Sequence, residues 1–155
     1  MPISPDCMIG DQVKIYYENL VNLYGCTIGS NTQIGPFVEI QKNVVIGKNC
    51  KISSHSFICE GVVIQDSVFI GHGVMFVNDK YPKSINSDGS IKRDGDWKLE
   101  ETIIEKGASI GSNATILPGI VIGKNSLIGA GATITKDIPH SKIVVRNNEI
   151  LGTKK

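Results

Sequence analysis

Isoleucine returns at every sixth position over most of this chain. The series runs unbroken from Ile28 to Ile70, Phe76 takes the next position, and the series resumes from Ile104 to Ile134. A period of six matches neither the 3.6-residue turn of an α-helix nor the alternation of a long strand. It predicts a short strand and a turn, repeated, with three units forming a triangular coil of about eighteen residues. The predicted fold is therefore all-β, a parallel β-helix of hexapeptide repeats.

The positions two residues before each isoleucine are also expected to point inward, because successive strand side chains alternate between faces. Small or β-branched residues occupy nearly all of them, namely Cys26, Thr32, Val38, Val44, Cys50, Val62, Val68, Ala108, Ala114, Ser126 and Ala132. At these inward positions cysteine is expected to fill the core, not to act as a catalytic thiolate. Glycine often follows the isoleucine, where a positive φ or a close backbone approach is expected. Ile116 and Ile122 are predicted to be fully buried.

The repeat is imperfect at both ends of the predicted domain, which spans residues 1–155. Ile15 and Ile28 are thirteen residues apart, which predicts one extra residue as a turn bulge within 16–26. After Ile134 the period is lost, so we expect a C-terminal tail over 135–155. Within it, the segment KDIPHSKIVV is predicted to be a closing strand and the final GTKK to be frayed.

Composition excludes several classes of protein. A chain of 155 residues can bury a core, and its net charge of +1 argues against a general nucleic-acid binder. No apolar run approaches the roughly 18 residues of a membrane span, and the first residues do not resemble a signal peptide. Four cysteines without C-x-x-C spacing are expected to be reduced thiols of a cytoplasmic protein. No metal site is predicted, because the three histidines lack the spacing that seeds a zinc site. Of these, His140 in the tail is expected to be structural or solvated.

The repeat stops over residues 77–101, and this insertion carries the sole tryptophan, Trp97, together with Tyr81. Loops of this length in a compact domain are usually functional or disordered. The two aromatic side chains are expected to pin the insertion onto the prism or a neighbouring subunit, creating a cleft that a smooth prism lacks. A tolerated surface insertion is the alternative.

Two histidines are expected beside the start of the insertion. His72 lies two residues after an isoleucine, so its side chain should face outward, and His55 lies seventeen residues earlier, close to one coil. We expect both histidines next to Asn78, Asp79 and Glu60, which makes this group the candidate functional site. For either histidine alone, a solvated turn residue is an equally good interpretation.

The repeats resemble the left-handed β-helix acyltransferases, a family of homotrimers. More narrowly, SHSFICEGV, GHGVMFVNDKYP, the tryptophan-bearing insertion and KGASIGSNATILPGIVIG are similar to bacterial nucleotide-sugar N-acetyltransferases. The resemblance implies acetyl transfer from acetyl-CoA to the 3-amino group of a UDP- or dTDP-linked amino sugar. The products of such enzymes feed surface glycans such as O-antigen.

The resemblance also implies roles for particular residues. The family's sugar-contacting asparagine matches Asn78 in Phe76-Val77-Asn78, and the expected substrate-binding set is Asn78, Asp79, Tyr81, Glu60 and Trp97. CoA would lie between neighbouring prisms along the later coils, at Ala108, Gly111, Ala114, Gly129, Ala130 and Ala132. Independently of the resemblance, three basic residues late in the chain, Lys136, Lys142 and Arg146, are candidates for phosphate binding, and a solvated face is an equally good interpretation of them. The family's closing Gly-Asn-Pro-Ala run is replaced by Arg146-Asn147-Asn148-Glu149, so contacts to the adenine end of CoA do not carry over.

Amide formation needs a neutral amine, a nearby thioester and a donor for the developing oxyanion. His72 is the first candidate for the base and His55 the second, with Asn78 orienting the substrate. An amine that arrives already neutral would need no base. Three alternatives stay open at this point: an O-acetyltransferase or small-amine acetyltransferase, a zinc protein of the γ-carbonic-anhydrase kind, and a non-catalytic scaffold.

Overall fold

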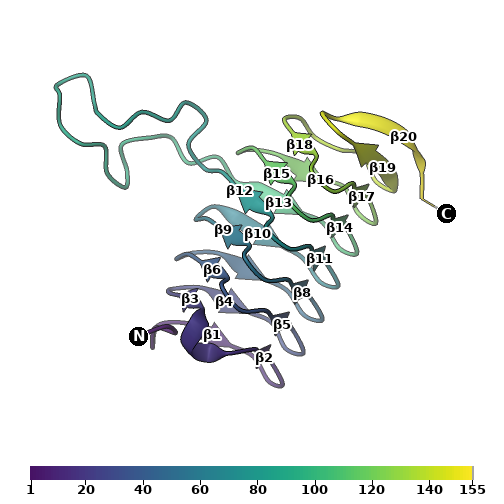
Figure 1. Cartoon of the computed structure of the whole chain (residues 1–155), viewed down its shortest axis with the longest axis horizontal. Coiled ribbons are helices and arrows are strands. Elements are labelled where there is room, and N and C mark those ends of the chain that lie inside the picture. Colours follow the sequence, from purple (N-terminus) through teal and green to yellow (C-terminus); the bar gives the residue numbers. More distant parts are fainter. Residues whose placement is uncertain (155) are drawn as a thin grey trace.

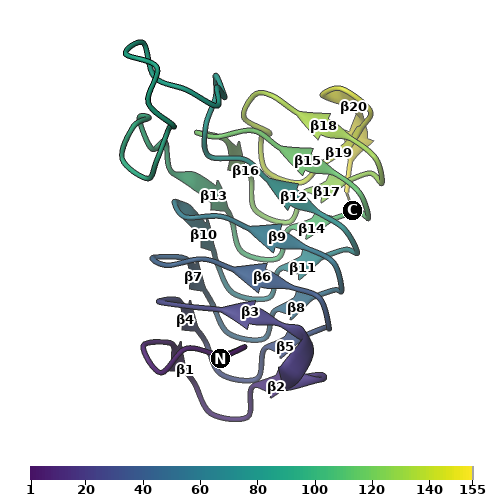
Figure 2. The ribbon, with the colours of Figure 1, turned by 60° about the vertical axis from the view of Figure 1, so that its left-hand side comes forward.

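The chain forms a three-sided prism of stacked coils in a computed structural model that describes residues 1–154 (Figure 1). Each coil contributes one short strand to each side, and the three sides are three sheets (Figure 2). Apart from the final pair β19–β20, all strand pairs are parallel. The prediction of an all-β, parallel β-helix of hexapeptide repeats is confirmed.

The first face consists of β1 (Met8–Ile9), β4 (Thr27–Ile28), β7 (Val45–Ile46), β10 (Val62–Ile64), β13 (Thr102–Ile104) and β16 (Val121–Ile122). The second face consists of β2 (Lys14–Ile15), β5 (Gln33–Ile34), β8 (Lys51–Ile52), β11 (Phe69–Ile70), β14 (Ser109–Ile110), β17 (Leu127–Ile128), β19 (Lys142–Val145) and β20 (Glu149–Thr153). The third face consists of β3 (Asn22–Leu23), β6 (Glu39–Ile40), β9 (Phe57–Ile58), β12 (Met75–Phe76), β15 (Thr115–Ile116) and β18 (Thr133–Ile134). A 3₁₀ turn, η1 (Glu18–Leu20), precedes β3.

The isoleucines fill the prism in vertical rows. Ile52, Ile70 and Ile110, for example, pair in register on three successive coils of the second face. Ile116 and Ile122 are both fully buried, as predicted. Because most buried isoleucines pair with isoleucines on the coils above and below, the core is one continuous column.

The corners of the prism use two kinds of residue. Where glycine follows the isoleucine, it allows the coils to approach, since a Cβ on Gly47 would lie 2.7 Å from Asp66 N and one on Gly71 would lie 2.6 Å from Ser112 N. The positive φ instead falls three residues after the isoleucine, mostly at glycine or asparagine, as at Asn31 and Asn49. Of the two reasons expected for glycine after the isoleucine, close approach is therefore the one that applies at these two positions.

The N-terminal irregularity differs from the single bulge that the sequence predicted. Ile15 pairs with Ile34 nineteen residues on, whereas Leu23 pairs with Ile40 only seventeen residues on. Two residues are therefore added at the corner that contains η1, and one is removed at the next corner. Their sum is the one extra residue counted in the sequence.

The C-terminal tail closes the prism. Ile138 bridges to Ile122, and β19 pairs with β17 at a spacing of sixteen residues, which confirms a closing strand. The prediction that the final GTKK is frayed is wrong for Gly152 and Thr153, because both belong to β20, which pairs antiparallel with β19. Lys155 lies outside the described residues.

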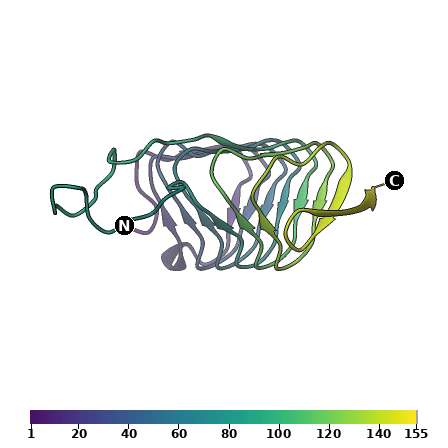
Figure 3. The same ribbon diagram turned by 90° about the horizontal axis from the view of Figure 1, so that it is seen from above.

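The insertion leaves the prism between β12 and β13 and projects sideways as an arm (Figures 1 and 3). A small antiparallel bridge between Ile85 and Ile91 organises its outer part. Within residues 1–154, no helix has the length and apolar character needed to cross a membrane.

Candidate functional site

Two corners of the prism carry the candidate residues. We call the corner between the second and third faces the His72 corner, which contains residues 71–74 and their equivalents on other coils. The corner between the third and first faces is the Asn78 corner, from which the insertion departs. The chain crosses β12 to pass from one corner to the other.

His72 is exposed, and side chains of the coils below and above hold it. Its Nδ1 lies 2.8 Å from the Oγ of Ser54, and its backbone N–H donates to the Oγ of Ser112 at 3.3 Å. The ring borders a hollow of about 220 Å³ on the second face, which Tyr16, Lys51 and Phe69 also line. His72 therefore combines an accessible ring with a fixed hydrogen-bond partner.

His55 lies at the same corner one coil below, so the two histidines occupy adjacent coils, as the spacing of seventeen residues predicted. Its backbone N–H donates to Pro36 O at 3.2 Å, and its φ of 64° places it in the left-handed region. The imidazole packs against Phe37 with ring centroids 4.8 Å apart. His55 is not among the residues that line the hollow beside His72.

The Asn78 corner contains a second hollow, also of about 220 Å³. Asn78 is half-buried there, and its Nδ2 donates to the backbone oxygen of Glu60 at 3.3 Å. The hollow is lined by side chains from three coils and the insertion, namely Tyr24, Gln41, Lys42, Phe57, Glu60, Asn78, Asp94 and Trp97. The lining of this hollow contains more polar groups than the lining of the hollow beside His72. A ligand with many hydroxyl groups needs such polar partners.

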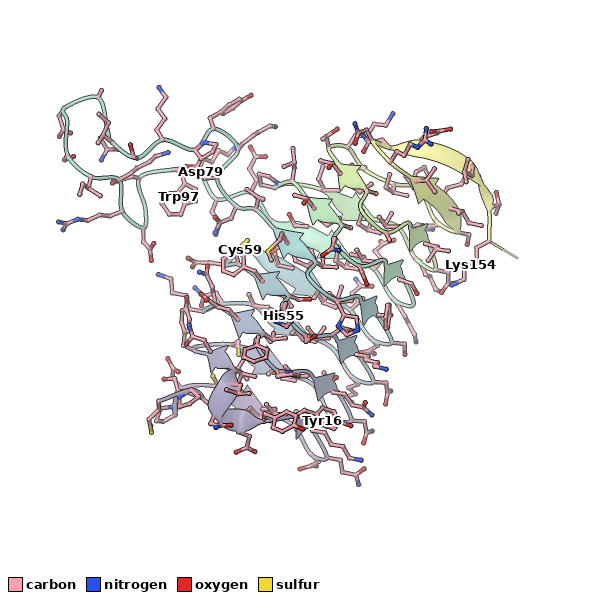
Figure 4. The ribbon with its side chains drawn as sticks, in the orientation of Figure 1. Tyr16, His55, Cys59, Asp79, Trp97 and Lys154 are labelled. Atoms are coloured by element: carbon pink, nitrogen blue, oxygen red, sulfur yellow. The ribbon has the colours of Figure 1, made fainter. Side chains whose placement is uncertain are left out.

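Ion pairs fix the base of the insertion at this corner. Lys92 Nζ lies 2.6 Å from Asp79 Oδ2 and 5.7 Å from the centroid of Trp97, and Figure 4 shows Asp79 and Trp97 at the base of the arm. The hydrogen bond from Lys92 holds the pKa of Asp79 below its usual value. Trp97 is half-buried, whereas Tyr81 is 76% exposed. The expected anchoring thus comes from Trp97 and the ion pair, and Tyr81 does not take part in it.

A further link ties the arm to the prism. Lys42 Nζ lies 3.0 Å from Asp94 of the arm and 3.7 Å from Glu60 of the prism. The amide of Asn43 donates to the other oxygen of Glu60 at 2.7 Å. Glu60 therefore sits within a network of fixed polar contacts at the wall of the hollow.

The prediction that both histidines lie next to Asn78, Asp79 and Glu60 is wrong within one chain. His72 and His55 lie at one corner, and Asn78, Asp79 and Glu60 lie at the next. The physical reason is the six-residue repeat itself, because six residues carry the chain along one side of the triangle. The candidate residues therefore form two half-sites.

The residues that the family resemblance assigns to CoA binding fall into two groups, buried and exposed. The side chains of Ala108, Ala114 and Ala132 are fully buried in the core, so the expectation that they line a CoA groove is wrong for their side chains. Those that remain at the surface are Gly111, Gly129, Ala130 and Arg146 along the His72 corner and Lys136 at the Asn78 corner. The His72 corner thus presents a track of small residues that rises from the histidine toward the C-terminal end.

Three residues that contact the two half-sites, Ser54, Lys42 and Lys92, were not predicted from the sequence. Ser54 stands one coil below His72, at a spacing of eighteen residues that could have revealed it. Lys42 contacts the site through an ion pair with Asp94 of the insertion, and Lys92 does so through an ion pair with Asp79 inside the insertion, whose sequence has no repeat.

The cysteines and the remaining histidine behave as structural residues. Cys26 and Cys50 are buried, as predicted, and burial raises the pKa of Cys26 to about 12. His140 is exposed, and its Nε2 lies 2.8 Å from Glu105 Oε2. Among residues 1–154, no three His, Cys, Asp or Glu side chains gather as a metal-binding group.

Known proteins share both the repeat and the fold. The family model described as bacterial transferase hexapeptide (six repeats) matches residues 25–60 and 101–136. The chain is 36% identical over 164 residues to the bifunctional protein GlmU of Thermotoga maritima, and 32% identical over 147 residues to GlmU of Carboxydothermus hydrogenoformans. These alignments cover 97% and 90% of this chain but only 35% and 31% of the relatives, so the chain spans about a third of their length.

Solved structures support the fold at lower identity. A point mutant of AntD, an N-acyltransferase from Bacillus cereus, in complex with dTDP and coenzyme A, superposes with a TM-score of 0.74 at 19% identity, covering 96% of this chain and 84% of AntD. A perosamine N-acetyltransferase from Caulobacter crescentus, in complex with CoA and GDP-perosamine, gives 0.64 at 17% identity, covering 97% and 55%. The chain carries the hexapeptide repeat of bacterial transferases, and its resemblance to hexapeptide-repeat acyltransferases is confirmed.

Proposed function

We propose that this chain is a CoA-dependent N-acetyltransferase that acts on the 3-amino group of a dTDP- or UDP-linked amino sugar. The observation that carries this proposal is the hollow at the base of the insertion, where Asn78, Glu60 and Trp97 converge. Its polar lining and aromatic wall suit a hydroxylated sugar joined to a planar base. The CoA, dTDP and GDP-perosamine in the complexes of AntD and the perosamine enzyme support the coarser part of this proposal, a CoA-dependent enzyme that acts on a nucleotide-linked sugar.

The two half-sites support the proposal that the chain works as a homotrimer. One chain cannot bring His72 and Asn78 to the same reacting atom, because one side of the prism separates them. In a closed threefold assembly the His72 corner of one subunit faces the insertion corner of its neighbour, and this completes the site. Acetyl-CoA would then follow the small residues above His72, with Arg146 and Lys136 near its phosphates.

In this arrangement the residues take distinct roles. Asn78 orients the sugar so that its amine nitrogen faces the thioester carbon. As the C–N bond forms and the C–S bond breaks, His72 Nε2 accepts the proton lost by the amine and returns it to the CoA sulfur. A backbone N–H at the corner glycines would donate to the oxyanion.

The direct test is release of CoA thiol from acetyl-CoA across a panel of UDP- and dTDP-linked amino sugars. Asn78→Ala should lower kcat/KM for the amino sugar at least tenfold, or roughly 1.4 kcal/mol of transition-state stabilisation, without changing CoA affinity. Asn19→Ala, at the N-terminal end of the prism, is the matched control and should match the parent. If the wild-type protein acetylates no amino sugar of the panel, the proposal is refuted. If Asn78→Ala is fully active, the assigned sugar site is refuted.

Assembly is tested separately by light scattering. The expected mass is three times the 16.7 kDa of one chain. A monomer at micromolar concentration, with acetyltransferase activity intact, would show that the site does not require two subunits.

A further inference from the structure

Two serines hold His72, one on the coil below and one on the coil above. The Ser54 hydroxyl meets the ring at Nδ1 at 2.8 Å, while the Ser112 hydroxyl meets only the backbone N–H at 3.3 Å. These serines therefore make different contributions, because one acts on the imidazole and the other on the main chain.

The coil ladder places Ser54 opposite the ring. Ser54 and His72 are eighteen residues apart, one full coil, and the backbone oxygen of Ser54 accepts from Gly73 N–H at 3.0 Å. Below them, a Cβ on Gly35 would lie 2.8 Å from Ser54 N, so only glycine allows this approach. The hydroxyl is thus fixed by the most regular part of the fold.

No carboxylate competes for the ring within the hollow beside His72. Its described lining contains Tyr16 and Lys51 as the other titratable side chains, and neither Asp nor Glu. A carboxylate partner would favour the cationic form of an imidazole, whereas a hydroxyl is neutral. A hydroxyl oxygen can also accept from Nδ1–H in both the neutral and the cationic ring.

We propose that Ser54 is a positioning residue that accepts a hydrogen bond from Nδ1–H of His72 and so leaves Nε2 unprotonated toward the reacting amine. The role in turnover rests on the base function proposed for His72. The same Nδ1–H···Oγ bond persists when Nε2 takes up the proton, so the ring keeps its orientation through the reaction. Assignment of the ring tautomer is what distinguishes this role from a merely structural one.

The first test is ¹⁵N NMR of the histidine-labelled protein, with His72→Gln assigning the signals. In the wild type, Nδ1 of His72 should carry the proton and Nε2 should not. Ser54→Ala should give the tautomer mixture of an unrestrained imidazole, Ser54→Thr should restore the single tautomer, and Ser112→Ala should leave it unchanged. A wild-type ring protonated on Nε2 alone, or a tautomer unaffected by Ser54→Ala, would overturn the inference.

The second test is steady-state kinetics on the same variants. Ser54→Ala should lower kcat about tenfold or more, with KM for acetyl-CoA changed by less than about twofold, and Ser54→Thr should recover most of the rate. Wild-type turnover together with a fully active Ser54→Ala would overturn the positioning role while the acetyltransferase proposal stands. If the wild type acetylates no amino sugar, the proposed function fails, and the NMR result alone decides whether Ser54 fixes the ring.

Discussion

Truncation of Ile116 measures how rigidly the stacked core is held. Ile116 is fully buried on β15, in register between Phe76 on the coil below and Ile134 on the coil above. Ile116→Ala removes three carbon groups, which at about 0.8 kcal/mol each gives roughly 2.4 kcal/mol of lost transfer free energy. The cavity adds to this, because the parallel ladders on both sides prevent the neighbouring coils from collapsing into it.

We therefore expect Ile116→Ala to lower the free energy of unfolding by about 3–5 kcal/mol, at the upper end of the range for such truncations. For a chain of this size that is a fall in Tm of roughly 6–20 °C. Thr115→Ala is the matched control, since Thr115 is the half-buried outward neighbour on the same strand, and it should change stability by less than about 1 kcal/mol.

The assay is urea denaturation followed by circular dichroism, with all variants at one protomer concentration, because an oligomer unfolds with a concentration-dependent midpoint. A loss below about 1.5 kcal/mol for Ile116→Ala, or an equal loss for both variants, would refute the rigid column. It would mean that neighbouring side chains repack into the space or that the assignment of inward residues is wrong.

Two further predictions concern the corner and the insertion. Gly71→Ala should lower Tm by several degrees, because its Cβ would lie 2.6 Å from Ser112 N. Gly152→Ala is the control and should leave Tm unchanged, because nothing lies within 4 Å of a Cβ at that position. Thermal melts of both variants make the comparison, and equal Tm values would contradict the close approach at Gly71. Because Lys92 lowers the pKa of Asp79, their contact should persist from neutral pH down to about pH 4 and be lost below it, as the carboxylate is protonated. Trp97 fluorescence should therefore change only in acid in the wild type, and already at pH 7 in Lys92→Met; identical emission of the two proteins at pH 7 would exclude the anchoring role.

The core could be predicted from the sequence because one physical constraint repeats. Each isoleucine faces the same column, so the period alone identifies the buried residues, and Ile116 and Ile122 are both fully buried. The positive-φ position was missed although its signal is present, since Asn31, Asn43 and Asn49 each stand three residues after an isoleucine of the repeat. Asparagine tolerates the left-handed region better than other side chains, so it marks the turn as glycine does.

The sequence led to the expectation that Asn78, Glu60 and Trp97 lie together, and they line one hollow, but the position of the histidines relative to them was wrongly predicted. Spacing in the sequence suggested that His72 and Asn78 are neighbours, yet six residues are one side of the triangle. The same count therefore assigns them to different corners. The contacts of the insertion could not be predicted, because this segment has no repeat. The partners of Lys92 and Asp94 depend on the path of the loop in space and not on their spacing in the sequence.

The parallel ladder explains how this prism accommodates so long an insertion. Val63 pairs with Val45 eighteen residues before it and with Ile103 forty residues after it, so one coil contains 22 extra residues. Parallel pairing continues on both sides of the insertion, because each strand pairs with the coils above and below and not with the strand that follows it in the chain. The cost is loop closure, which grows only slowly with loop length. Stability therefore resides in the isoleucine column, which leaves the corners free to carry Ser54, His72 and the arm that bears Trp97.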